Sequence, residues 1–201
     1  MVLNMVQVLK EEVRERIYSA AVEEFYENNY NSAKMKDIAR RANIPTGLIY
    51  SYYKNKEDLF AGIARPVFQK LKEFIKGKKD RDQGGERIFD VFEEIEIDFI
   101  MNLFQERKQL IILVDKSEGT EFEGAKEEIV NLLEIHIREG LAGKIKGIED
   151  DYKDFFYHIL ADNFTGRMFE IFRHFEDLNK ARKMIELIAR QHFYGVYDFV
   201  K

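Results

Sequence analysis

The stretch from residue 29 to residue 60 constrains the fold of this chain more than any other. Its first apolar positions recur at spacings of three and four, as they do on one face of a helix: Met35, Ile38, Ala39 and Ala42. Asn43 follows, and asparagine is the residue after glycine that best adopts the left-handed backbone that ends a helix. Pro45 has no N–H to leave unpaired and suits the first turn of a second helix that extends to Tyr53. The pattern predicts a helix-turn-helix.

The next helix and the local charge agree with this interpretation. Asn55 is placed to cap a further helix, with Asp58 three residues on in an arrangement that resembles a capping box. Residues 34 to 56 contain six lysine and arginine residues and one aspartate, a net charge of +5, although the whole chain carries −5. Because nucleic acids are polyanions, this concentration of positive charge predicts a nucleic-acid surface at the helix-turn-helix.

The run DIARRANIPTGLIYSYYKNKEDLF, residues 37–60, resembles the N-terminal DNA-binding signature of TetR-family transcriptional regulators. The positions that match this signature in register are Asp37, Ile38, Ala39, Ala42, Gly47, Ile49, Tyr50, Tyr52, Lys56, Glu57 and Leu59. Asn43 replaces the usual turn glycine, Pro45 replaces the usual serine, and Ala33 and Lys34 stand where threonine or serine is common. The resemblance implies a DNA-binding head of three helices, followed by a helical domain that binds an effector and dimerises.

The remainder of the chain also predicts helices. Two prolines and no cysteine occur in 201 residues, and few segments alternate with period two, so we expect an all-α fold of about nine helices. The lack of cysteine excludes disulfides and cysteine-based zinc sites. No apolar run approaches the ~20 residues of a membrane helix, and the start lacks the pattern of a secretory signal. We therefore expect a cytoplasmic protein that does not contact a membrane.

The chain divides into two predicted domains, the helix-turn-helix DNA-binding domain (1–54) and a helical effector-binding and dimerisation domain (55–201). Gly77 to Gly85 is the clearest linker, and Pro66 predicts a kink or break in the helix that begins at Asn55. The other predicted helices cover residues 7–28, 86–105, 150–175 and 178–200, with a further helix from about 122 or 126 to 140. Residues 108–116 form a short apolar segment. The last two are apolar on most faces, which indicates a subunit interface. The resemblance implies a homodimer through these helices, about residues 150–200.

Nine residues of the helix-turn-helix region are the candidate DNA contacts. In such a motif the N-terminal residues of the second helix face base edges while the first helix crosses the backbone. Lysines are expected at phosphates, and Thr46, Tyr50 and Tyr52 at bases, thymine methyls or phosphates. The full candidate set is Lys34, Lys36, Thr46, Gly47, Tyr50, Ser51, Tyr52, Lys54 and Lys56. By contrast, we expect Ile49 and Tyr53 in the core, and Arg40 and Arg41 in solvent or in salt bridges.

Polar residues on the apolar C-terminal helices are the candidate effector contacts, because ligand pockets are mostly apolar with a few convergent polar groups. The candidates are His136, Tyr157, His158, Asn163 and Arg167. The abundance of phenylalanine favours an apolar or aromatic effector. His158 and Asp162 could share a metal ion, but two ligands make too weak a site, and we expect no metal or cofactor.

The sequence contains no motif that predicts catalysis: no glycine-rich phosphate loop, no serine or cysteine nucleophile with a base, and no HExxH. The interpretation is therefore a repressor that binds a palindromic operator in double-stranded DNA as a homodimer and is released by a small molecule. Two alternatives stay open. One is a DNA-binding regulator without an effector, and the other is a helical ligand-binding or scaffold protein with a vestigial helix-turn-helix.

Overall fold

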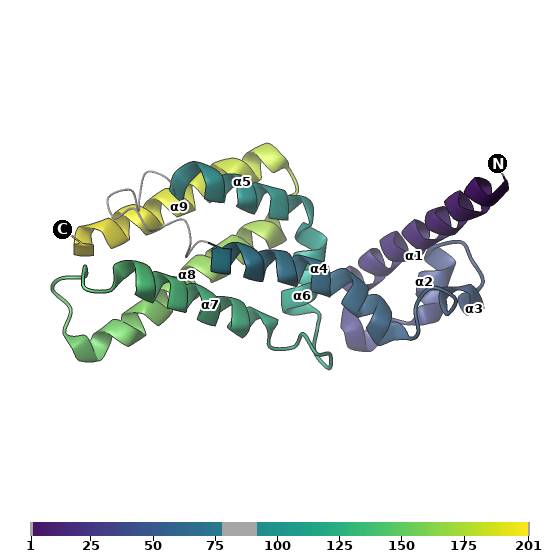
Figure 1. Ribbon diagram of the computed structural model, residues 1–201, viewed down its shortest axis with the longest axis horizontal. Coiled ribbons are helices and arrows are strands. Elements are labelled where there is room, and N and C mark those ends of the chain that lie inside the picture. Colours follow the sequence, from purple (N-terminus) through teal and green to yellow (C-terminus); the bar gives the residue numbers. More distant parts are fainter. Residues whose placement is uncertain (1, 78–91, 201) are drawn as a thin grey trace. The chain divides into compact units, whose positions relative to one another are not determined.

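The computed structural model describes residues 2–77 and 92–200, and within these ranges it contains helices and turns but no strand. The helices are α1 (Val2–Ser32), α2 (Met35–Arg41), α3 (Thr46–Ile49), α4 (Lys56–Gly77), α5 (Phe92–Gln105), α6 (Arg107–Asp115), α7 (Ala125–Leu141), α8 (Asp150–His174) and α9 (Leu178–Val200) (Figure 1). The predicted all-α fold of about nine helices is confirmed. Beyond Gly77, the predicted linker lies outside the described residues.

Two compact units make up the described chain. The first, here called the head unit, comprises the described residues up to Phe68 together with Lys108–Gly124. The second, here called the C-terminal unit, comprises the residues described between Gln69 and Arg107 and from Ala125 onward. The head unit therefore includes a segment, α6 and the turns after it, that is distant in sequence from the helix-turn-helix. The domain boundary after residue 54 stays a prediction.

Three helices differ from the sequence prediction. Helix α1 begins earlier and continues to Ser32, with a break at Asn29, whose φ of 59° and ψ of 173° are not helical. Helix α3 spans only Thr46–Ile49, because Pro45 is its N-cap in extended conformation and the chain beyond Ile49 forms turns. Helix α4 continues without a break through Pro66.

The end of α2 determines where α3 lies. Asn43 has a φ of 53°, the left-handed conformation predicted for it. Its N–H donates to the carbonyl of Arg40 at 3.1 Å, and the N–H of Ile44 donates to the carbonyl of Ala39 at 3.0 Å. These two hydrogen bonds form a Schellman motif, which satisfies carbonyls at the helix end and reverses the chain. The tight turn between the two helices of the motif is thus encoded locally, by a residue that tolerates positive φ.

This conformation leads to a prediction for Asn43. Asn43→Val should lower the free energy of unfolding by about 1–2 kcal/mol, because a left-handed backbone is costly for a residue with a branched Cβ. Asn43→Gly should leave the stability nearly unchanged or raise it slightly, because glycine adopts positive φ freely. Thermal or urea unfolding of the two variants tests this, and equal effects of valine and glycine would contradict the account.

An aromatic cluster forms the centre of the head unit. The rings of Phe25 and Phe60 meet edge to face with centroids 5.0 Å apart, and Tyr30 contacts Phe60 at 5.2 Å. Phe122, from the turns after α6, lies 6.2 Å from Phe60 and 6.3 Å from Phe68. Phe25, Phe60 and Phe122 are buried. The helix-turn-helix is therefore supported by α1, by the first part of α4 and by the segment that follows α6.

The C-terminal unit is built on neighbouring helix pairs, in which α8 packs against both α7 and α9, and α5 packs against α9 (Figure 1). One of its clusters comprises Leu141, Ile145, Tyr157 and Val196. Helices α8 and α9 are joined by only a few residues. Asp177 caps the start of α9, where its side chain accepts a hydrogen bond from the N–H of Lys180 at 2.8 Å. In the described part of the chain, no helix is long and apolar enough to cross a membrane.

Candidate nucleic-acid interface

The start of α4 closes the helix-turn-helix as the sequence predicts. The N–H of Asp58 donates to the side-chain oxygen of Asn55 at 2.8 Å, and a carboxylate oxygen of Asp58 accepts from the N–H of Lys54 at 2.9 Å. Main-chain donors at a helix start otherwise lack partners, so this reciprocal arrangement stabilises the turn between α3 and α4. The predicted cap at Asn55 is confirmed.

Most of the nine candidate DNA contacts lie in solvent. The side chain of Tyr50 is 52% exposed, although it follows the fully buried Ile49. Tyr53 is buried as well, so the predicted core positions of Ile49 and Tyr53 are confirmed. The exposed candidates are Lys34, Lys36, Thr46, Gly47, Tyr50, Ser51 and Lys54, whereas Tyr52 and Lys56 are half-buried. DNA contact by these residues stays a prediction.

Gly47 lies at the start of α3 with open space beside it. A Cβ added at this position would meet no atom within 4 Å. Packing inside the chain therefore gives no reason for glycine here, in contrast to Gly119, where a Cβ would lie 3.0 Å from the side chain of Asn31.

Arg40 and Arg41 are engaged in ion pairs, as the sequence predicts. Arg40 pairs with Asp37 at 3.0 Å, and the Nε of Arg41 pairs with the buried carboxylate of Glu24 at 3.0 Å. Arg41 also pairs with Glu27, whose hydrogen bond is the largest cause that raises the pKa of the Arg41 guanidinium. The two pairs of Arg41 attach α2 to α1, whereas the pair of Arg40 lies within α2. The other positive charges between residues 34 and 56 belong to lysines, which are not among the ion pairs found for the described residues.

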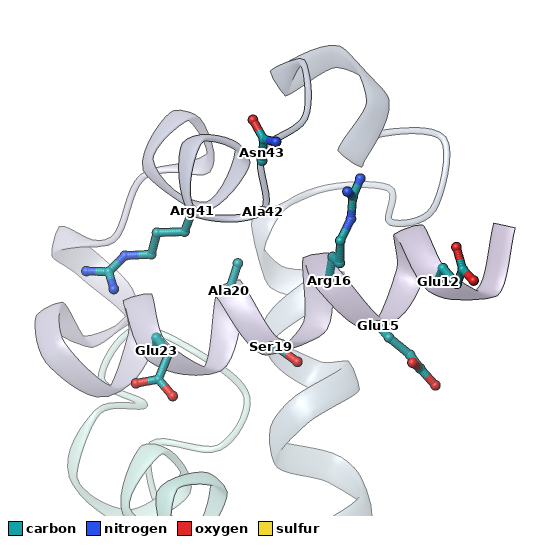
Figure 2. Close-up of a pocket in the computed structure, with 9 residues that line it drawn as sticks. All are labelled: Glu12, Glu15, Arg16, Ser19, Ala20, Glu23, Arg41, Ala42 and Asn43. Carbon is teal, nitrogen blue, oxygen red and sulfur yellow. The ribbon is translucent and has the colours of Figure 1, made fainter. Parts of the chain in front are cut away.

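An open hollow of about 880 Å³ lies between α1 and α2 (Figure 2). It is lined by Glu12, Glu15, Arg16, Ser19, Ala20, Glu23, Arg41, Ala42 and Asn43. Carboxylates outnumber guanidinium groups in this lining, and none of the nine candidate DNA contacts belongs to it. The hollow thus lies apart from the residues predicted to contact DNA.

Lys56 differs from the other candidate lysines. Its ammonium nitrogen, Nζ, lies 2.8 Å from the carbonyl oxygen of Tyr30, 3.3 Å from that of Ala33 and 3.5 Å from that of Asn31. The same nitrogen lies 4.4 Å from the centre of the Tyr30 ring, a cation–π distance. Burial lowers the pKa of Lys56 from its ordinary value. The sequence predicted a phosphate contact here, whereas the structure places the ammonium on main-chain carbonyls of the α1–α2 turn.

The five candidate effector contacts do not converge on one site. Tyr157 is buried in the core cluster of the C-terminal unit, with the Arg138 guanidinium 5.5 Å from its ring. His158 is exposed and pairs with Glu134 at 3.0 Å. His136 is half-buried on α7. Tyr157 and His158 adjoin in sequence but serve different environments, because neighbouring residues of a helix point in different directions.

Asn163 and Arg167 do lie together, in a groove between α8 and α9. This groove has a volume of about 420 Å³, and its lining also includes Ile171, Phe175 and Ile188. Arg167 donates a hydrogen bond across it to Gln191 at 3.2 Å. The groove is the place where two of the five predicted residues share one surface. Among the described residues, no three metal-ligating side chains gather in one cluster.

Comparison with known proteins identifies the head. Residues 17–63 match the profile of the family described as bacterial regulatory proteins, tetR family. The chain is 38% identical over 60 residues to the fatty acid metabolism regulator protein of Bacillus subtilis, covering 30% of this chain and 29% of that protein. It is 45% identical over 51 residues to the HTH-type transcriptional regulator HbdR of Aromatoleum sp., covering 25% and 22%. The chain thus spans less than a third of the length of these relatives.

The fold extends the similarity beyond the head. A solved TetR-like transcriptional regulator from Rhodococcus sp. RHA1 superposes with a TM-score of 0.62 at 17% identity, over 91% of this chain and 96% of that one. At this identity the likeness concerns the fold alone. The relatives named here are regulators rather than enzymes, in agreement with the absence of catalytic motifs in the sequence.

Proposed function

From the match of residues 17–63 to the TetR family, we propose that the chain is a transcriptional repressor that binds a palindromic operator as a homodimer. It acts in the cytoplasm on double-stranded DNA and is released by a small effector. The observation that carries this proposal is the exposed set around α3: Tyr50, Thr46 and three lysines lie in solvent beside a helix whose own core residue, Ile49, is buried. A recognition helix needs this division of faces.

The lysines supply the electrostatic part of the proposal. Lys34, Lys36 and Lys54 are exposed around the motif, and Arg40 and Arg41 are already paired with carboxylates. Each phosphate that a lysine neutralises releases counterions, so binding should weaken steeply as salt is added. Titration of a duplex at several salt concentrations tests this. A binding constant that does not change with salt would contradict the proposed role of the lysines.

The base-reading part rests on Thr46 and Tyr50. We predict that Thr46→Ala and Tyr50→Ala reduce the discrimination between the operator and mismatched duplexes by about 1–3 kcal/mol, because they remove groups that contact base edges. Lys54→Ala should instead weaken binding to all sequences alike. Competition between operator and mismatched duplexes measures both quantities. If all three variants lose affinity equally and keep the same sequence preference, this division of roles is wrong.

The homodimer is supported by apolar side chains that a single chain leaves in solvent on α8 and α9. Phe155 of α8 is 67% exposed, and Leu187 and Tyr194 of α9 are 60% and 62% exposed. The groove that contains Asn163 and Arg167 lies between the same two helices. A second copy that covers these surfaces would remove the apolar area from water. Sedimentation or light scattering should give a dimer, and Phe155→Asp should shift the protein toward a monomer.

The effector is proposed to be small and apolar or aromatic. The C-terminal unit is rich in phenylalanine, and the ring of Phe172 contacts those of Phe104 and Phe169. An effector releases DNA only if it binds the DNA-incompetent state more tightly than the competent one. A thermal-shift screen of apolar and aromatic compounds, followed by DNA release with each hit, tests this. Hits that stabilise the protein without releasing DNA would reject the proposed regulation.

A further inference from the structure

The contacts of Lys56 account for all the donors that its side chain possesses. A lysine ammonium has three N–H groups and no acceptor, and three carbonyl oxygens lie within hydrogen-bond distance of it. To contact a phosphate, Lys56 would have to exchange these carbonyls and the Tyr30 ring for the new partner. Lys54, two residues earlier, is exposed, and its side chain makes no hydrogen bond among those found for the described residues.

The carbonyls held by Lys56 belong to a part of the backbone that needs support. They come from the residues between Asn29 and the start of α2, where the peptide groups at the end of α1 carry partial negative charge. Asn29 itself has a positive φ with an extended ψ, a conformation that non-glycine residues keep only where surrounding contacts impose it. Its side chain accepts a hydrogen bond from the N–H of Ser32 at 3.0 Å.

The turn is also held from the segment after α6. The N–H of Tyr30 donates to the carbonyl of Lys116 at 2.9 Å, so Tyr30 is hydrogen-bonded through both its N–H and its carbonyl. Lys56 is the first residue of α4, and Ala33 is two residues before the start of α2. One ammonium thus connects the first turn of α4 to the segment from which α2, and through it α3, begins.

We propose that Lys56 is a positioning residue, whose ammonium ties the first turn of α4 to the α1–α2 turn and so orients α2 and α3 for DNA. This inference rests on the proposed DNA-binding function. It replaces the predicted phosphate contact with an indirect role: Lys56 contributes to affinity through the backbone that presents Lys34, Lys36 and Thr46. The charge of Lys56 acts inside the protein, and the exposed Lys54 is the lysine of this turn that faces the solvent.

A lysine that contacts a phosphate and a lysine that positions the backbone affect the salt dependence of DNA binding differently. Lys56→Met and Lys54→Met are a matched pair, because each removes one positive charge from the same turn. Loss of a phosphate contact lowers the slope of log affinity against log salt by about 0.9, so we expect Lys54→Met to lower it by about 1.8, one contact for each subunit of the dimer. For Lys56→Met we expect the dissociation constant to rise by about tenfold or more, from the loss of charged hydrogen bonds, with the slope unchanged. An equal fall in slope for both variants would overturn the proposal.

A conservative variant separates positioning from charge. Lys56→Arg keeps the positive charge, but the planar guanidinium cannot direct three donors from one nitrogen at three carbonyls. We expect Lys56→Arg to remain weakened, whereas a point charge serving a phosphate would be restored by arginine. All measurements are made at a temperature where each variant is fully folded. Ile17→Val, a buried substitution in α1, controls for stability: it should lower Tm and leave the dissociation constant unchanged.

Hydrogen exchange gives a readout that does not require DNA. If Lys56 holds the turn, amides from Asn31 to Ile38 should exchange faster in Lys56→Met than in Lys54→Met or Ile17→Val. Equal exchange in the three variants would overturn the positioning role even if no duplex were bound. Absence of DNA binding by the unaltered protein, with faster exchange in Lys56→Met alone, would reject the proposed function and leave the structural tie standing.

Discussion

Phe122→Ala is expected to destabilise the head unit by about 3–5 kcal/mol, the cost of removing a buried phenylalanine that leaves a cavity. Phe122 is buried and contacts Phe60 and Phe68, and the Arg65 guanidinium lies 5.4 Å from its ring. The residue follows α6, well outside the predicted DNA-binding domain. A large loss of stability in the head should thus come from a position that sequence analysis assigned to the other domain.

A control for this prediction lies in the same unit. Tyr50→Ala removes an aromatic side chain of similar size that is half exposed, so its effect on the free energy of unfolding should stay within about 0.5 kcal/mol. Urea unfolding without DNA, followed by the fluorescence of the tyrosines or by circular dichroism, measures both. If Phe122→Ala costs no more than Tyr50→Ala, the segment after α6 does not belong to the core of the head.

Acid should destabilise the protein through His192. This side chain is buried on α9 against the ring of Phe164, and burial, followed by the positive charge of Arg167, lowers its pKa to about 4. Below pH 6.5 this histidine becomes protonated in the unfolded chain, whereas in the folded chain it stays neutral until the pH falls to about 4. The unfolded state is therefore stabilised relative to the folded state as the pH falls. The stability should decrease by up to about 1.4 kcal/mol per pH unit, and by roughly 3 kcal/mol at pH 4.

The variant His192→Phe isolates this effect. Phenylalanine fills a similar volume beside Phe164 and cannot take up a proton, so the variant should lose less stability between pH 6.5 and pH 4 than the unaltered protein. Above pH 7 the two should respond to pH alike, because the histidine is neutral in both states. Urea unfolding at intervals of half a pH unit gives the free energy of unfolding against pH for the variant and for the unaltered protein. Curves that stay parallel down to pH 4 would contradict the assignment to His192.

Local features of the helix-turn-helix were predictable because short-range chemistry determines them. The turn at Asn43 follows from the tolerance of asparagine for positive φ, and the cap at Asn55 follows from its spacing to Asp58. The burial of Ile49 and Tyr53 follows from their spacing of four, which the turn after α3 keeps because the N–H of Tyr53 donates to the carbonyl of Ile49 at 3.0 Å. In each case the residues that interact lie within a few positions of one another, so the pattern is visible in the sequence.

Features that depend on distant contacts were not predictable in this way. Phe122 reaches Phe60 from another part of the chain, and one phenylalanine among many carries no sign of its partner. Lys56 binds main-chain carbonyls, which every residue possesses, so no residue pattern reveals its acceptors. The predicted effector residues separate into different environments because the exposed face of α8 is determined by its packing against α7 and α9.

The central claim, that the head reads DNA sequence as part of a dimer, is tested most directly by selection of bound fragments from a random duplex pool, followed by sequencing. The account predicts a palindrome whose half-sites are about one helical turn, or ~10 base pairs, apart or slightly more. It also predicts that Thr46→Ala and Tyr50→Ala recover a more degenerate sequence from the same pool. Recovery of no sequence above background, by protein refolded from denaturant to remove any bound effector, would contradict the account.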